Sequence, residues 1–279
     1  MGLIKFITVF DDEKQMLLSE TVLKKYNISA YPVIYFSDGK AYYDGLNSDS
    51  DAFLRLKKSK GVTPPRIPAK VFQSAFLNAY NNGYFRVIVV CPHSKYFPYY
   101  KDAVTAANKF RHRKNIDFTS FDISVIDSKT FASGVNLFTL EIARQYELYH
   151  MHSDSLVDYC KNKAIKNKSM LLLRDGYIAG CSNNELTAIK SFGYKFEKFN
   201  LSASHDNVRL DNFADLVCSE INKGGGRYTV SVGSDCDFAG YVLGLIEKNT
   251  GIMPVCVMKY GIVSADVLGN SAFCVSLLN

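Results

Sequence analysis

The chain has 279 residues, of which 47% are hydrophobic and 22% are charged, and its formal net charge is +6. This composition excludes a disordered protein, and this length favours two domains because single cores stop growing near ~250–300 residues. The positive charge is spread along the chain without a long basic tract, which argues against a nucleic-acid partner.

The cysteines and apolar segments indicate the compartment. Seven cysteines show no CxxC spacing and mostly stand among apolar neighbours, so we expect buried free thiols in a reducing environment. No apolar stretch approaches the ~20 residues of a membrane span, and the N-terminus lacks the apolar region of a signal peptide. We therefore expect a cytoplasmic protein without an integral membrane segment.

The first elements follow one another in a β, α, β, β order. Residues 4–10 (IKFITVF) are typical of a buried strand, and residues 14–28 (KQMLLSETVLKKYNI) have helical spacing. Residues 30–45 contain two β-rich stretches around Asp38–Gly39, which predicts a hairpin. The three prolines of VTPPRIP (62–68) predict an extended loop.

The remaining chain alternates between strands and helices. The patterns predict helices over 69–83, 98–110, 135–148, 153–165, 210–221 and 238–249, and strands over 86–91, 123–127, 169–173, 228–232 and 253–260. Such alternation predicts an α/β fold of two domains, each a mainly parallel sheet flanked by helices. We place the boundary in the polar stretch near residue 166, which gives an N-terminal domain of residues 1–166 and a C-terminal domain of residues 167–279.

Three loops follow predicted strands and precede predicted helices. They are CPHSKYF (91–97), DSKTFASG (127–134) and GSDCDF (233–238). Ligands of parallel sheets bind beyond the carboxyl ends of the strands, where such loops supply donors for an anionic group. Ser and Asp before a helix are also ordinary N-caps, so both interpretations stay open.

Other motifs argue against catalysis, metals and cofactors. The run KGGGR (223–227) follows a helix and precedes a strand, which is the opposite order to a phosphate loop. His150 and His152 have no carboxylate or cysteine at metal-ligand spacing. Ser94 beside His93 and Ser128 beside Asp127 lack a GxSxG elbow, so we expect a protein that is not an enzyme.

Several segments together resemble the DegV family of bacterial fatty-acid-binding proteins. They are KYNISAYPV, YYDG, AKVFQSAFLNAYNNGY, RVIVVC and above all VIDSKTFASG, with a fainter likeness over GIMPVCVMKYGIVSADVLGNSAF. The resemblance implies a long acyl chain in an apolar tunnel, with its carboxylate held by hydroxyls in the cleft between two α/β domains. It also implies a fatty acid kinase as a partner, since some family members present the bound acid to one.

The chain departs from the family where the head group binds. The family's Thr-Ser-Gln-Pro is matched by Thr63, Pro64, Pro65 and Arg66, and its Leu-Ser-Gly-Thr by aromatic residues over 96–99. The family's C-terminal histidine is absent near 267–271. Arg66, Arg174 or a tyrosine hydroxyl is a candidate substitute donor, and Arg66 is favoured because it replaces a residue within the motif itself. By the resemblance, the ligand-binding residues are Thr63, Arg66, Ser94, Asp127 and Ser128.

The sequence therefore predicts a non-catalytic carrier for a long-chain fatty acid or a similar amphiphile, with no cofactor besides that lipid. An alternative hypothesis is a degenerate relative that has lost the lipid and acts through protein contacts, with Tyr96, Phe97 and Tyr99 filling the former cleft. A third hypothesis, an enzyme acting on a small anion, requires a general base within hydrogen-bond reach of a serine.

Overall fold

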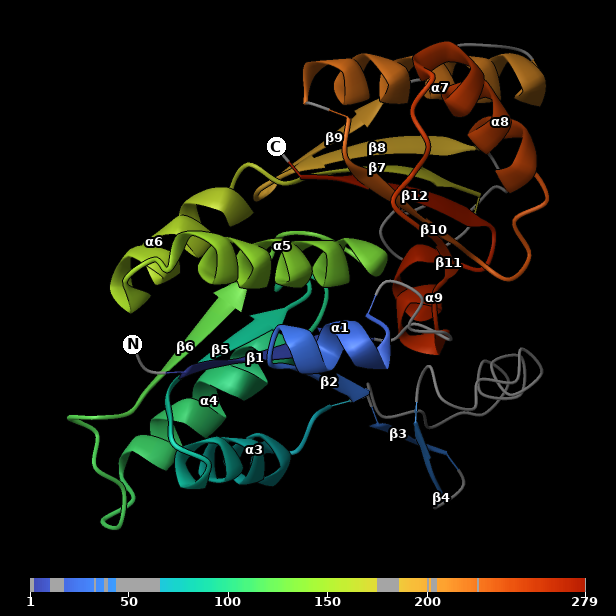
Figure 1. Ribbon diagram of the computed structural model, residues 1–279. Coiled ribbons are helices and arrows are strands. Elements are labelled where there is room, and N and C mark those ends of the chain that lie inside the picture. The colour runs from blue at the N-terminus through green and yellow to red at the C-terminus, as the bar shows by residue number, and fades with distance from the viewer. Residues whose placement is uncertain are drawn as a thin grey trace.

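The computed structural model describes residues 3–10, 18–32, 34–37, 40–43, 66–174, 186–199, 201, 205–224 and 226–278. These residues form a four-stranded sheet, a six-stranded sheet and a separate two-stranded hairpin. The two larger sheets lie one above the other with helices between and outside them (Figure 1). The α/β fold class is confirmed.

The first sheet contains β1 (Leu3–Phe10), β2 (Ile28–Pro32), β5 (Tyr84–Cys91) and β6 (Asp122–Asp127) in the order β2-β1-β5-β6. All of its neighbouring strands are parallel. Side chains of β1 alternate between two cores: Ile4 and Phe6 face one, and Ile7 and Val9 face the other. Burial on both faces is what makes such strands apolar nearly throughout.

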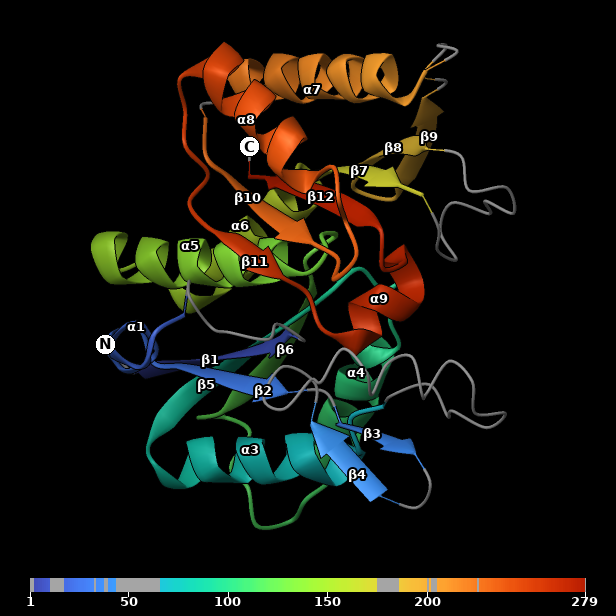
Figure 2. The same cartoon turned by 90° about the vertical axis from the view of Figure 1, so that its right-hand side faces the viewer.

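Helices cover both faces of this sheet. α3 (Ala69–Asn81) and α4 (Tyr99–Arg111) pack on the face that Ile7 and Val9 share. α1 (Glu20–Lys25), α5 (Ser133–Tyr149) and α6 (Ser153–Ala164) pack on the other face (Figure 2). The Ser19 hydroxyl caps α1 by accepting from the Val22 amide at 3.4 Å.

The second sheet contains β7 (Lys168–Leu173), β8 (Thr187–Phe192), β9 (Lys195–Phe199), β10 (Tyr228–Val232), β11 (Val257–Lys259) and β12 (Ala272–Leu277). Its order is β11-β10-β12-β7-β8-β9. Only β10 and β11 are parallel, and the other four pairs are antiparallel. The prediction of a mainly parallel second sheet is therefore wrong, because β12 returns between β10 and β7 and the β8–β9 hairpin extends the edge.

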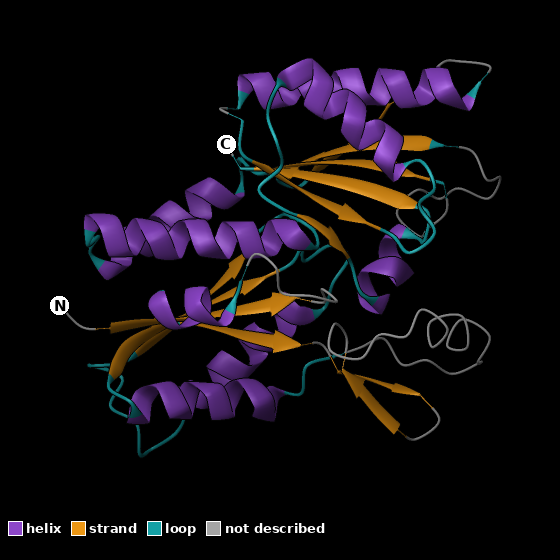
Figure 3. Cartoon of the chain, turned by 45° about the vertical axis from the view of Figure 1, so that its right-hand side comes forward, coloured by secondary structure: helices purple, strands orange, loops and turns teal. Residues whose placement is uncertain are grey.

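The outer face of the second sheet is covered by α7 (Asp206–Lys223) and α8 (Ala239–Thr250), while α9 (Ile262–Leu268) connects β11 to β12 (Figure 3). The inner face meets α5, which contacts β1 and β5 of the first sheet as well as β10 and β12 of the second. Every residue from Ser133 to Leu140 is buried. A helix buried all round is the expected result of lying between two sheets.

The α5 layer carries polar pairs toward both sheets. The Thr139 hydroxyl lies 3.2 Å from that of Thr8 on the first sheet, and the Ser133 amide donates to the Ser231 hydroxyl on the second at 3.1 Å. All strands of the first sheet precede residue 128, and all strands of the second sheet follow residue 167. We keep the boundary near residue 166 as a proposal on that basis.

Other predicted features can be compared with the described residues. β3 (Ile34–Ser37) and β4 (Lys40–Tyr43) pair antiparallel as the hairpin prediction requires, while Asp38 and Gly39 lie outside the described residues. Six of the cysteines are described, and all six are free thiols. No helix within the described ranges has the length and hydropathy needed to cross a membrane.

Candidate functional site

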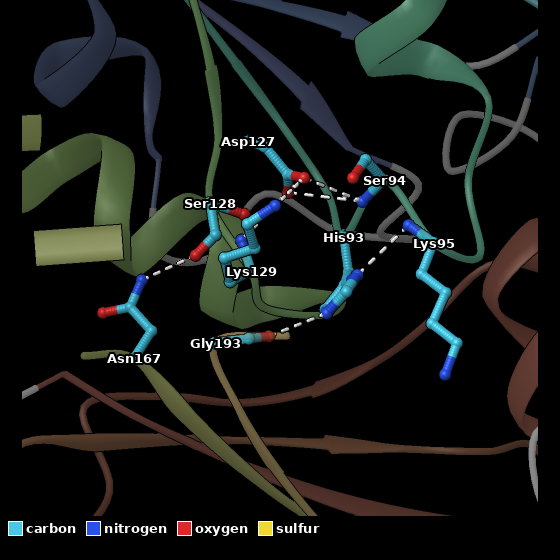
Figure 4. A network of polar contacts seen from close by, with 8 residues as sticks. All are labelled: His93, Ser94, Lys95, Asp127, Ser128, Lys129, Asn167 and Gly193. Atoms are coloured by element: carbon cyan, nitrogen blue, oxygen red, sulfur yellow. Dashed lines mark hydrogen bonds and ion pairs between the residues drawn. The ribbon is translucent and has the colours of Figure 1, made fainter. Parts of the chain in front are cut away.

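The carboxyl ends of β5 and β6 bring together three residues predicted from the sequence. Cys91 and Asp127 are neighbours in the parallel register, so the loops that follow them run side by side. The Ser94 amide donates to both carboxylate oxygens of Asp127, at 3.2 and 3.3 Å (Figure 4). The Ser128 amide donates to the Cys91 carbonyl at 2.9 Å. Ser94, Asp127 and Ser128 therefore form one site at this edge of the sheet.

Lys129 completes this site, although the sequence reasoning did not single it out. Its ammonium group forms an ion pair with Asp127, and its amide donates to the same carboxylate at 3.2 Å. Only 3% of the Lys129 side chain and 7% of the Asp127 side chain are exposed. A buried pair of this kind neutralises both charges. Asp127 therefore holds the two loops together through these hydrogen bonds. Because Lys129 balances its charge, it does not repel a neighbouring anion.

The backbone of the 128–132 loop is strained. Lys129 has a φ of +59° and Ala132 a φ of +42°, values that residues with a Cβ rarely adopt. Each such residue costs about 1–3 kcal/mol and persists only where the surroundings enforce it. Here the enforcement includes the Asp127 pair and the Tyr194 ring, whose centroid lies 3.3 Å from the Lys129 ammonium. Strain concentrated at a strand end marks this loop as a functional candidate.

His93 connects the site to the second sheet. Its Nδ1 accepts from the Lys95 amide at 3.2 Å, so Nε2 carries the proton and donates to the Gly193 carbonyl at 3.0 Å. Gly193 forms the turn between β8 and β9, with a φ of +56°. Burial lowers the pKa of His93 from its ordinary value, and the opposing effect of Asp127 is smaller. A neutral imidazole thus bridges the two units.

Aromatic side chains pack around His93 from both units. We call the set His93, Tyr96, Phe97, Phe131, Tyr194 and Phe196 the interdomain aromatic cluster. The Phe196 ring of β9 lies 5.1 Å from both the His93 and Tyr96 rings, and Phe131 lies 5.5 Å from His93. These separations are those of favourable ring pairs. Rings from the two units therefore pack directly against each other beside Ser94.

Two buried polar side chains near the strand ends have atoms without a partner among the described residues. The Ser128 hydroxyl is completely buried and has no hydrogen-bond partner among the described residues, and neither does the side-chain oxygen of Asn167. The Asn167 amide group donates to the Ser128 carbonyl at 2.8 Å. An unpaired buried hydroxyl costs about 1–3 kcal/mol. Ser128 is therefore placed where the polar atom of a ligand or a water would be stabilised.

Arg66 and Arg174, the candidate substitute donors, are each paired with an acidic side chain. The Arg66 guanidinium donates to Asp102 in the first turn of α4, with its Nε 3.0 and 2.9 Å from the two carboxylate oxygens. This hydrogen bonding raises the pKa of Arg66. Arg174 pairs with Asp206 at 3.5 Å. Thr63 lies outside the described residues.

No group of histidine, cysteine and acidic side chains with metal-binding geometry occurs in the described part of the chain. His150 ends α5 in a left-handed conformation, and both His150 and His152 are exposed.

Comparison with known proteins relates one segment of the chain to a family. Residues 15–148 match the family model described as an uncharacterised protein of the DegV family. The chain carries a DegV family domain. The matched segment contains Ser94, the Asp127–Lys129 pair and most of α5, and it ends before the second sheet begins. No curated protein sequence matches the chain significantly.

Solved structures extend the likeness to the whole chain. A fatty-acid-binding DegV family protein from Streptococcus agalactiae is 15% identical, with a TM-score of 0.77 over 100% of this chain and 99% of the other. A stearic acid-binding protein from Eubacterium ventriosum is 14% identical, with a TM-score of 0.76 over 99% and 98%. DegV of Bacillus subtilis, a fatty acid binding protein, is 12% identical, with a TM-score of 0.75 over 100% of both chains. Both sheets therefore share the DegV fold.

Proposed function

We propose that this DegV-like protein is a non-catalytic carrier for a long-chain fatty acid or a similar amphiphile. The observation that carries the proposal is the fold match over the whole chain to DegV structures described as fatty-acid-binding, which includes both sheets and the layer between them. The head group would lie at the carboxyl ends of β5 and β6, near the hydroxyls of Ser94 and Ser128. The family resemblance adds the hydroxyl of Thr63 as a further donor. The bound lipid is the only small molecule that the proposal requires.

The chemistry of the strand-end site suits a carboxylate. Because Lys129 neutralises Asp127, the site offers hydroxyl and amide donors without a net negative charge. Each hydrogen bond to the head group would contribute about 1.5–3 kcal/mol. Each buried methylene of the tail would add about 0.8 kcal/mol, so the tail supplies most of the affinity.

The same geometry supports a binding role over catalysis. A nucleophilic serine needs a base within hydrogen-bond reach, and the buried Ser128 hydroxyl has no such partner in the described part of the chain. The nearby carboxylate of Asp127 is occupied by the Lys129 ammonium and by two backbone amides. As a carrier, the protein would have as its partner a fatty acid kinase that acts on the bound acid.

Mass spectrometry of gently purified protein tests the proposal directly. We expect a co-purified fatty acid, or saturable binding of a fluorescent fatty acid to the stripped protein. Thr63→Val keeps the side-chain volume and removes a hydroxyl, so it should weaken fatty acid binding about tenfold with little loss of stability. Thr105→Val, at an exposed position of α4, is the matched control and should leave affinity unchanged. Absence of both co-purified lipid and saturable binding would reject the carrier.

One observation favours a second candidate function. The interdomain aromatic cluster joins the two units at the place where the family's head-group turn is replaced by aromatic residues. In a relative that has lost the lipid and acts through protein contacts, aromatic rings would fill the former lipid cleft in this way. The double variant Tyr96→Ala/Phe196→Ala separates the two candidates. A carrier whose rings line the site should lose affinity for the fluorescent fatty acid, whereas a filled relative should bind it only after the rings are removed.

A further inference from the structure

A pocket of about 360 Å³ lies at the opposite, amino end of the first sheet. Its walls come from the starts of β1 and β5, from β2 and from the last turns of α3. The described residues that line it are Leu3, Lys5, Ile7, Ser29, Tyr31, Ala75, Asn78, Ala79, Asn82 and Tyr84. Pockets of about 300 Å³ and above are large enough for small ligands. This one is separate from the Ser94 site, because it lies at the other end of the strands.

The pocket exists because the helices cover this face unevenly. α4 packs on β5 and β6, and α3 packs mainly on β5, so the β1–β2 half of the face has less cover. Two of the α3 residues that face the gap, Ala75 and Ala79, are small and buried and reach little into it. β2 is the edge strand of the sheet. The hollow is thus bounded by a helix on one side and by an edge strand on the other.

Lys5 is an unusual residue for its position. The next β1 residue on the same face is Ile7, whose side chain is 1% exposed and belongs to the core. Lys5 is half-buried, and this burial lowers the pKa of its ammonium group. No carboxylate of the described chain pairs with it, and its ammonium group lies over the Tyr84 ring, 5.7 Å from the ring centroid. A partly desolvated cation without an anion favours a negatively charged ligand.

The rest of the lining adds neutral hydrogen-bond donors and no competing anion. The Asn82 amide group donates to the Asn78 side-chain oxygen at 2.6 Å, which leaves the Asn78 amide nitrogen able to donate. The Tyr84 hydroxyl donates to the Asn27 side chain at 3.2 Å, which fixes the ring beneath Lys5. Burial raises the pKa of Tyr31, so its phenol stays protonated and is a donor. None of the described lining residues is acidic.

We propose that this pocket binds a small organic anion, with its carboxylate or phosphate group on Lys5 and a hydroxylated body between Tyr31, Tyr84 and the end of α3. The inference is independent of the fatty acid proposal, because no residue of the pocket belongs to the strand-end site. An anion at this position would supply the counter-charge that the described residues do not provide for Lys5.

The test uses ¹H–¹⁵N NMR titration of the full chain with glucose 6-phosphate, gluconate and uncharged glucose. We expect saturable shifts of the Lys5, Ser29 and Asn82 amides with at least one of the two anions, and none with glucose at concentrations up to about 10 mM. Saturation by glucose 6-phosphate would identify phosphate as the recognised group, and saturation by gluconate would identify carboxylate. No saturation by either anion, or equal binding of glucose, would overturn the proposal.

Two variants test the role of Lys5 itself. Lys5→Gln keeps the length of the side chain and removes its charge, so it should weaken binding of the anion at least about tenfold. Lys70→Gln, an exposed position in the first turn of α3, should have no effect. Ser29→Asp supplies Lys5 with an internal carboxylate and should also abolish binding. Unchanged anion affinity in Lys5→Gln would contradict the proposal. An unchanged ¹H–¹⁵N spectrum of the same variant outside the pocket would show that the protein is folded.

Discussion

The two ends of the first sheet differ in whether their buried or half-buried lysine has a carboxylate partner in the described chain. At the carboxyl end, Asp127 and Lys129 are almost completely buried, and each satisfies the other. At the amino end, Lys5 faces a pocket without a carboxylate partner in the described chain. Lys129 at the carboxyl end stabilises the fold, whereas Lys5 at the amino end is available to a ligand. The structural context, and not the residue type, therefore decides which charges hold the fold together.

Replacing the lysine by methionine at each end of the sheet is the strongest test of this difference. Lys129→Met leaves the Asp127 carboxylate buried without its counter-ion, so we expect a loss of about 3–5 kcal/mol in the free energy of unfolding. Lys5→Met removes an unpaired, half-buried charge and should change that free energy by less than about 0.5 kcal/mol. Urea denaturation of both variants measures the difference. The double variant Asp127→Asn/Lys129→Met should recover much of the loss, and equal effects of Lys129→Met and Lys5→Met would refute the contrast.

The close packing behind the carboxyl end has a second expected cost. A Cβ added at Gly134 would lie 2.1 Å from the Thr130 hydroxyl oxygen and 2.5 Å from that of Ser276. Gly134→Ala should therefore cost about 1–3 kcal/mol through overpacking between α5 and β12. Gly240, in the first turn of α8, has no atom within 4 Å of an added Cβ. Gly240→Ala should instead stabilise by up to about 1 kcal/mol, and denaturation midpoints compare the two.

The smallest expected effect concerns pH and His93. Because burial lowers its pKa, the folded state favours the neutral imidazole. Its contribution to stability is fully present above the ordinary pKa of about 6.5 and is lost as the pH falls through the lowered folded value. The charged groups that face it are Asp127, Lys129 and Lys95. Unfolding free energies measured between about pH 7.5 and 5.5 should fall with pH, and His93→Gln should remove most of that slope.

Local patterns predicted most elements of the first half, because strands such as RVIVVC are buried on both faces and depend little on their neighbours. The pairing direction in the second sheet was not predictable in the same way. It depends on where β12 enters, and β12 pairs with β7 about a hundred residues earlier. A usable signal was missed at β8 and β9, where Thr187–Phe199 contains two alternating stretches around Gly193.

The candidate site was predictable in part for the same physical reason. Strand-end geometry brings Ser94 and Asp127 together whatever the side chains are, so the rule for parallel sheets was sufficient. From the sequence alone, Lys129 is expected to be exposed to solvent. Its burial depends on the packing of Tyr194 above it, which no local pattern reveals. The hydrogen bond from His93 to Gly193 joins residues a hundred positions apart and has no local signature.

Helix α5 has a consequence for folding and for fragment design. Its first turns are buried on the side of β1 and on the side of β10 and β12, so each unit supplies one wall of the other's core. A fragment ending at the proposed boundary near residue 166 would keep α5 while losing the sheet that covers it. Such a fragment would expose a broad apolar surface and aggregate. The two units are therefore expected to unfold in a single cooperative transition, although their sheets share no strand.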